Sequence, residues 1–275
     1  MNFGTNLTKI GDFSFHYNQF ITSINIPDQV TYLGESAFDQ TEKLSNVTFG
    51  SGLTTISKYA FGDCGKITNL VIPSNIKTIE EDAFFGNQLQ SITFNEGLTS
   101  IGDAAFMFVK YSQSDDYDTT LNARLTSLSF PDSLKTIGNQ AFASQEALTS
   151  LTFGSSIEKI GEGAFANANV TSMSKTASSN LEIADLTLYS SGFKKALYCS
   201  SAKNGTINVN ANTTEIAAGC YKGVKADSIS LPNGLVTIGD RAFASAFSYS
   251  SKVNVNVPGS VKTIGVEAFN YANVA

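Results

Sequence analysis

Few side chains in this sequence have the type and spacing that catalysis or metal binding requires. Three carboxylates stand within four residues at Asp115, Asp116 and Asp118, with Tyr117 among them and Tyr111 shortly before. Clustered carboxylates can bind Ca²⁺, but the ligand spacing of an EF-hand loop is absent. A solvated loop is the simpler interpretation. Among the segments of this chain it is nevertheless our best candidate for a contact surface, because insertions in repeat proteins often carry function.

The remaining reactive side chains do not form a catalytic set. His16 is the single histidine, and no carboxylate stands at a fixed position beside it, so a Ser-His-Asp triad cannot be argued. We interpret it as a loop residue that, with Tyr17, forms a second and smaller candidate contact surface. Cys64, Cys199 and Cys220 are odd in number and widely spaced, which fits neither a disulfide framework nor a zinc site. The sequence predicts no enzyme, no cofactor and no metal.

The elements that must position these side chains form a repeat. The phrase LVTIGDRAF at residues 235–243 recurs about ten times, for example as VTYLGESAF at 30–38 and LKTIGNQAF at 134–142. Most neighbouring copies start about 23 residues apart, which is typical of a stacked solenoid. The final aromatic residues of the copies are Phe15, Phe38, Phe61, Phe84, Phe106, Phe142, Phe165, Tyr221, Phe243 and Phe269.

A second phrase lies between these copies, such as ITNLVIP at residues 67–73 and LTSLSFP at 125–131. All five prolines of the chain end this phrase, where a strand must stop because proline donates no hydrogen bond. Apolar and polar residues alternate within it, so each unit contributes a short strand to a parallel sheet. We expect the LxxIGxxAF phrase to be a turn or short-helix return segment.

The outward side chains of the predicted strands are Ser, Thr or Asn, with Val71 as the exception. The simpler interpretation is a hydroxyl and amide ladder that solvates a flat sheet. The alternative is a polar surface for a glycan or an extended polypeptide, although binding hot spots favour Trp, Tyr and Arg, which are missing from these positions.

Two segments break the regular spacing: an insertion at residues 107–124 and an irregular stretch at residues 167–205. The gap between Phe165 and Tyr221 must hold a degenerate unit, and our candidate is the segment 193–201, with Ala196 and Leu197 standing for Ala-Phe. An insertion, a kink in the solenoid and simple drift are the alternatives for the irregular stretch. We predict one domain over residues 1–275 with about ten to eleven units, because stacked units share one continuous core.

The phrase pair resembles the BspA-type leucine-rich repeat, also called the Treponema pallidum type, with a pattern near LxxIxIPxxLxxIGxxAFxxC. ITNLVIPSNIKTIEEDAF and LTSLSFPDSLKTIGNQAF follow it closely, whereas Ile56-Ser57 and Ile79-Glu80 depart from its Ile-Gly pair. The resemblance implies a curved, right-handed leucine-rich repeat array. It also implies a cell-surface or secreted protein of a host-associated microbe, of a kind that adheres to matrix proteins or cells.

Composition narrows the possible partners. The formal net charge is -6 and no run of Lys or Arg is present, which argues against nucleic-acid binding. No stretch of about 18 apolar residues predicts a membrane span. The chain enters a repeat almost at once without a signal peptide, and we expect it to be part of a longer array. We predict a non-catalytic, surface-exposed binding or adhesion domain for a protein ligand or cell-surface component, with a structural spacer as the alternative.

Overall fold

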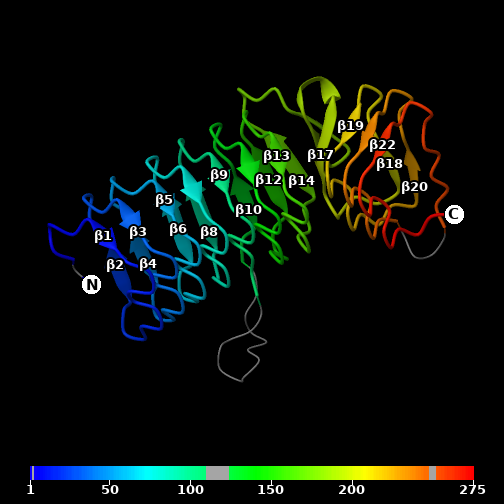
Figure 1. Cartoon of the computed structure of the whole chain (residues 1–275). Coiled ribbons are helices and arrows are strands. Elements are labelled where there is room, and N and C mark those ends of the chain that lie inside the picture. The colour runs from blue at the N-terminus through cyan, green and yellow to red at the C-terminus, as the bar shows by residue number, and fades with distance from the viewer. Residues whose placement is uncertain (2, 110–123, 248–251) are drawn as a thin grey trace.

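The computed structural model describes residues 1, 3–109, 124–247 and 252–275. The chain winds into an elongated stack of about 11 turns, and its two termini lie at opposite ends of the stack (Figure 1). Each regular turn contributes two short strands, so two columns of parallel strands run along the molecule. The right-handed sense of the coil stays a prediction.

The first column is formed by the phrase with alternating polar and apolar residues, and it confirms the predicted strands. Neighbouring strands pair in parallel and in register, so that Ile24 lies opposite Val47 and both side chains point into the core. The strands are β2 (Ser23–Asn25), β4 (Asn46–Thr48), β6 (Asn69–Ile72), β8 (Ser91–Phe94), β10 (Ser127–Ser129), β12 (Ser150–Phe153), β14 (Ser172–Lys175), β18 (Thr206–Asn208) and β20 (Ser228–Ser230).

The second column corrects the expected return segment. Its Leu-x-x-Ile part forms two-residue strands, because the stacked Thr-Ile pairs bury the isoleucine and leave the preceding side chain outward. The AF part forms turns, and the helical segment among the described residues is the 3₁₀ turn η1 (Ser191–Phe193). The strands are β1 (Lys9–Ile10), β3 (Tyr32–Leu33), β5 (Thr55–Ile56), β7 (Thr78–Ile79), β9 (Ser100–Ile101), β11 (Thr136–Ile137), β13 (Lys159–Ile160), β19 (Glu215–Ile216), β21 (Thr237–Ile238) and β22 (Thr263–Ile264).

The AF turn has a fixed backbone geometry. Residues two before and two after the aromatic residue adopt positive φ, as Ser36 (51°) and Gln40 (56°) do around Phe38. Two left-handed residues separated by three others reverse the chain without a helix. The amide of Phe38 then donates to the carbonyl of Ala60 in the next turn at 2.9 Å. The turns are therefore stacked by hydrogen bonds as the strands are.

A column of aromatic rings runs through the core, among buried Ile, Leu and Val side chains from both strand columns. Successive rings from Phe15 to Phe165 have centroids 5.0 to 5.7 Å apart and lie nearly parallel, within the range of favourable ring packing. Close stacking also explains a glycine. A Cβ on Gly154 would lie 2.0 Å from the carbonyl oxygen of Pro131 in the previous turn, so no side chain fits there.

The irregular stretch departs from this pattern. After β14 the chain forms an antiparallel meander of β15 (Glu182–Ala184), β16 (Thr187–Tyr189) and β17 (Lys195–Cys199). β17 then pairs in parallel with β19, which places Ala196 opposite Ile216. Ala196 therefore holds the isoleucine position of the repeat, and our alignment of Ala196-Leu197 with Ala-Phe is wrong. Beyond Phe165, the next ring in space is that of Tyr198, at 5.1 Å and tilted by 57°.

Candidate functional site

The stack of two-residue strands is interrupted after β13. The sheet β13-β11-β9-β7-β5 ends at this strand, and the next sheet, β15-β16-β17-β19-β21-β22, begins with the meander. The interruption opens two hollows. We call them the turn cleft, of about 740 Å³ beside the Phe165 turn, and the strand cleft, of about 720 Å³ between β13 and strands β17, β19 and β21.

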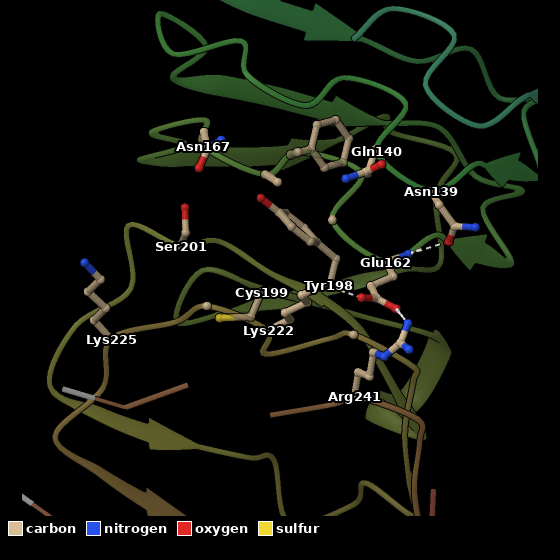
Figure 2. Close-up of a pocket in the computed structure, with 15 residues that line it drawn as sticks. Asn139, Gln140, Glu162, Asn167, Tyr198, Cys199, Ser201, Lys222, Lys225 and Arg241 are labelled. Carbon is tan, nitrogen blue, oxygen red and sulfur yellow. Dashed lines mark hydrogen bonds and ion pairs between the residues drawn. The ribbon is translucent and has the colours of Figure 1, made fainter. Parts of the chain in front are cut away.

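The turn cleft is lined mainly by polar side chains. Asn167, Ser201 and Lys225 lie at one end of it, while Glu162 and Arg241 lie at the other (Figure 2). Between these ends the cleft is lined by partly buried Tyr198 and by buried Cys199. Burial raises the pKa of both groups, to about 12 for the Cys199 thiol, which keeps the thiol protonated and unreactive at neutral pH. The cleft therefore offers amides, a hydroxyl and cations, and no activated nucleophile among these groups.

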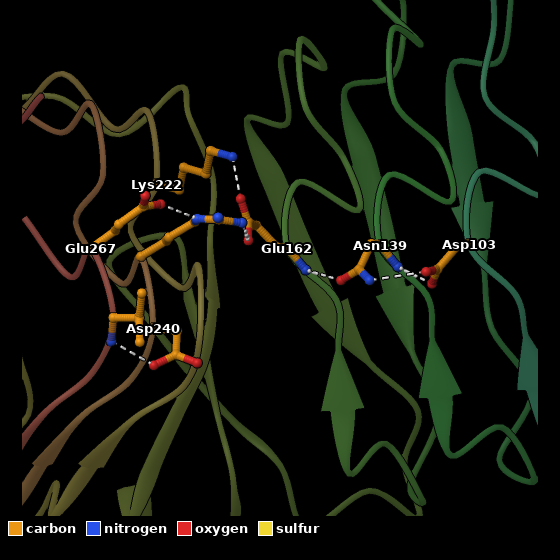
Figure 3. A network of polar contacts seen from close by, with 8 residues as sticks. Asp103, Asn139, Glu162, Lys222, Asp240 and Glu267 are labelled. Carbon is orange, nitrogen blue, oxygen red and sulfur yellow. Dashed lines mark hydrogen bonds and ion pairs between the residues drawn. The ribbon is translucent and has the colours of Figure 1, made fainter. Parts of the chain in front are cut away.

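Glu162 connects the two sides of the break (Figure 3). Its carboxylate accepts from the ammonium of Lys222, 60 residues later in the chain, and from Arg241 Nη1 at 3.3 Å. Arg241 Nε also donates to Glu267 Oε2 at 2.6 Å. Burial alone would raise the pKa of Glu162, but the two cations outweigh burial and lower it below its ordinary value. Glu162 is therefore ionised at neutral pH and ties the turns after the break to the turn before it.

The neighbouring turns explain why Glu162 is available for this contact. In a regular turn the residue after Ile-Gly caps the amide of the next turn: Asp103 Oδ1 accepts from Asn139 N at 2.7 Å, and Asn139 Oδ1 accepts from Glu162 N at 2.9 Å (Figure 3). Glu162 is the last member of this row, and its carboxylate turns to the cations instead. Gly219 permits the approach, because a Cβ there would lie 3.0 Å from the Glu162 side chain.

The residues predicted from sequence lie elsewhere. Tyr111, Asp115, Asp116, Tyr117 and Asp118 fall outside the described residues, so the predicted contact surface at the insertion stays a prediction.

His16 and Tyr17 lie in the turn between β1 and β2, two strands at the N-terminal end of the stack (Figure 1). Contrary to expectation, His16 has a carboxylate neighbour, with Nδ1 3.3 Å from Asp39 Oδ2. The rings of Phe13 and Tyr17 pack against the imidazole, and both are about half exposed. Burial raises the pKa of Asp39 to about 6.

The outward face of the first strand column behaves as a solvated ladder. Its side chains hydrogen-bond to one another along the stack, as Thr48 Oγ1 does to Asn25 Oδ1 at 2.6 Å and Ser91 Oγ does to Asn69 Oδ1 at 2.7 Å. Val71 is 56% exposed among these polar neighbours. Where two of these polar groups pair with each other, this face offers a partner fewer free donors and acceptors than its composition indicates.

Within residues 1, 3–109, 124–247 and 252–275, no group of three or more His, Cys, Asp or Glu side chains is arranged to hold a metal ion. Over the same residues, no helix has the length and apolar character needed to cross a bilayer.

The stacked turns, the paired strand columns and the aromatic core define a β-solenoid repeat protein. The chain belongs to the BspA-type leucine-rich repeat family, whose model matches residues 2–114, 118–244 and 191–275 in 6 copies. No curated protein matches the chain.

The two clefts at the break were not predictable from the family pattern. Their one signal in the sequence was the missing AF phrase between Phe165 and Tyr221.

Two solved structures of bacterial leucine-rich repeat proteins share this fold. One is from Eubacterium ventriosum, at 22% identity and a TM-score of 0.64 over 81% of this chain. The other is from Bacteroides ovatus, at 22% identity and a TM-score of 0.56 over 97% of this chain and 80% of its own length. The matched part of this chain spans 56% of the length of the Eubacterium ventriosum protein.

Proposed function

We propose that this chain is a non-catalytic, surface-exposed binding domain that makes adhesive contacts with a protein of a host matrix or cell surface. The observation that carries the proposal is the break after β13, where a regular array opens into two adjoining clefts lined by cations and amides. A repeat array that serves only as a spacer between a surface and another domain needs no such interruption. The family resemblance supports a cell-surface or secreted location.

A structural spacer that displays another domain is the second candidate. The polar ladder on the first strand column favours it, because side chains such as Thr152 and Ser174 hydrogen-bond to each other along the stack. A spacer has no ligand of its own, so binding measurements separate the two functions.

The test is a binding panel with the immobilised 275-residue chain against matrix proteins, glycans and whole host cells. Three variants assign the surface: Ser201→Trp fills the turn cleft, Ser129→Trp adds bulk to the outward strand face, and deletion of residues 112–122 removes the acidic insertion. We expect saturable binding that Ser201→Trp reduces at least about tenfold, whereas the other two variants keep it. Loss in the deletion would assign binding to the insertion. Absence of binding to every member of the panel would favour the spacer.

A further inference from the structure

Each regular AF turn donates three backbone amides to the next turn. The donors are the residues two before, at and two after the aromatic residue. In the turn before the break, Gln140, Phe142 and Ser144 donate in this way at 3.0, 2.7 and 2.7 Å. The acceptors are carbonyls of alternate residues in the next turn. Each turn therefore needs a neighbouring stretch of polypeptide whose alternate carbonyls face it.

The turn at the break lacks this neighbour. Its equivalent donors are the amides of Gly163, Phe165 and Asn167, and none of them has a hydrogen-bond acceptor among the described residues. The carbonyls of Glu158 and Ile160, whose counterparts in regular turns accept amides from the next strand, likewise have no donor there. The physical cause is the meander, because β17 is paired on one side with β16 and on the other with β19.

These unpaired groups face the two clefts. Gly163, Phe165 and Asn167 line the turn cleft, whereas Glu158 and Ile160 line the strand cleft. An unpaired backbone edge is a template for another chain, and unsatisfied polar groups gain free energy when a partner supplies the missing hydrogen bonds. Strand addition to a free edge is a common way of binding an extended peptide.

Charge indicates which peptide fits. Three cations, Lys222, Lys225 and Arg241, line the turn cleft with one carboxylate, Glu162, which already pairs with two of them. Lys225 is exposed and has no carboxylate partner within the described ranges. A carboxylate on the ligand would therefore meet a free ammonium at the end of the cleft that holds Asn167 and Ser201 (Figure 2).

From these observations we infer that the turn cleft binds an extended segment of a partner polypeptide that carries an acidic side chain. Alternate carbonyls of the segment accept from the amides of Gly163, Phe165 and Asn167, and its carboxylate pairs with Lys225. Gly163, Phe165 and Asn167 all line the turn cleft, so this cleft is where the segment binds. A volume of about 740 Å³ lies within the range of specific ligand sites. This inference rests on the proposed function and names the partner's chemistry.

The experiment uses a phage-displayed library of random twelve-residue peptides, selected on the whole 275-residue chain. Enriched peptides are synthesised, and their affinity is measured by fluorescence polarisation. The test variant is Lys225→Glu, which reverses the free cation in the cleft. The matched control is Lys66→Glu, which makes the same charge change at an exposed position in a distant turn.

We expect the enriched peptides to contain Asp or Glu and to bind Lys225→Glu at least about tenfold more weakly than the wild-type chain. The Lys66→Glu variant should bind within about twofold of wild type. Amide hydrogen exchange at residues 163–167 should slow when peptide is added, which a purely electrostatic surface contact would not produce.

Three results would overturn the inference: no enriched peptide, equal binding by the two variants, or unchanged exchange at residues 163–167. Self-association that Lys225→Glu abolishes would also overturn it, because the cleft would then take a second copy of this chain. If the binding panel is positive while the peptide selection fails, the binding function stands and this mode of recognition is wrong. If the panel itself is negative, the binding function fails.

Discussion

Removing one ring from the middle of the aromatic column should destabilise the protein strongly. Phe142 is fully buried, and its ring lies 5.1 Å from that of Phe106 and 5.7 Å from those of Phe130 and Phe165. The stacked turns are held by backbone hydrogen bonds, so the walls cannot collapse into the space that the ring leaves. We therefore expect Phe142→Ala to cost about 4–5 kcal/mol, the upper half of the range for buried phenylalanine.

The assay is urea unfolding followed by far-UV circular dichroism and by tyrosine fluorescence, since the chain has 10 Tyr and no Trp. If the unfolding curves from the two probes coincide, unfolding is two-state and one free energy of unfolding describes it. The control is Phe269→Ala in the separate ring stack after the break, where the ring is half-buried and, among the rings of the described residues, packs on Phe243 alone. It should cost about 1–2 kcal/mol. Equal losses in the two variants, or a loss below about 1 kcal/mol for Phe142→Ala, would refute the continuous aromatic core.

Three further predictions concern the pKa of Asp39, the close packing of backbone at Gly154 and the unpaired amide of Phe165 at the break. Burial raises the pKa of Asp39 from 3.8 to about 6, so its ionised form opposes folding above about pH 6 by about 1–2 kcal/mol after solvent screening of this partly exposed group, and this cost disappears as the pH falls below 3.8. Asp39→Asn should be more stable than wild type at pH 8 and equal to it near pH 3.5 in urea unfolding; a constant difference would contradict the raised pKa. Gly154→Ala should lower the melting temperature because the new Cβ meets a backbone carbonyl, whereas Gly259→Ala has open space and should leave it unchanged or slightly higher; equal shifts would argue against the stacking geometry. The amide of Phe165 should exchange at least about tenfold faster than that of Phe142 in NMR hydrogen exchange, and equal protection would show that the edge at the break is paired.

Much of the fold was predictable because every repeat carries the same local residue pattern. The shared position of all five prolines marked the strand ends, and the alternation of apolar residues marked the first strand column. The second column was missed because a two-residue strand such as β11 has no period that a sequence can display. Its pairing depends on the turns above and below it. Of the two alternatives for the return segment, the AF part forms the turn and not the short helix, because left-handed residues such as Ser36 turn the chain.

The candidate site was much less predictable. The missing AF phrase marked residues 167–205 as irregular, but the sequence did not show whether this stretch is an insertion, a kink in the solenoid or simple drift, and it did not indicate the meander. The acidic insertion drew attention because its carboxylates are close in sequence. The cleft instead joins Glu162, Lys222 and Arg241, which are separated by up to 79 residues and meet because the stack brings them together.

The sequence by itself determined that this chain is a stack of similar turns with an aromatic core, because each turn carries the same inward residues at the same spacing. It also fixed the membership of the BspA-type leucine-rich repeat family. Only the tertiary structure decided where the stack is interrupted. Asp103 and Glu162 hold the same position in the repeat, yet one caps the next turn and the other binds Lys222 and Arg241. The two residues differ because a regular turn packs beside Asp103, whereas the meander follows Glu162. The hydrogen bonds of a backbone edge are made only where a strand or turn of matching geometry packs beside it.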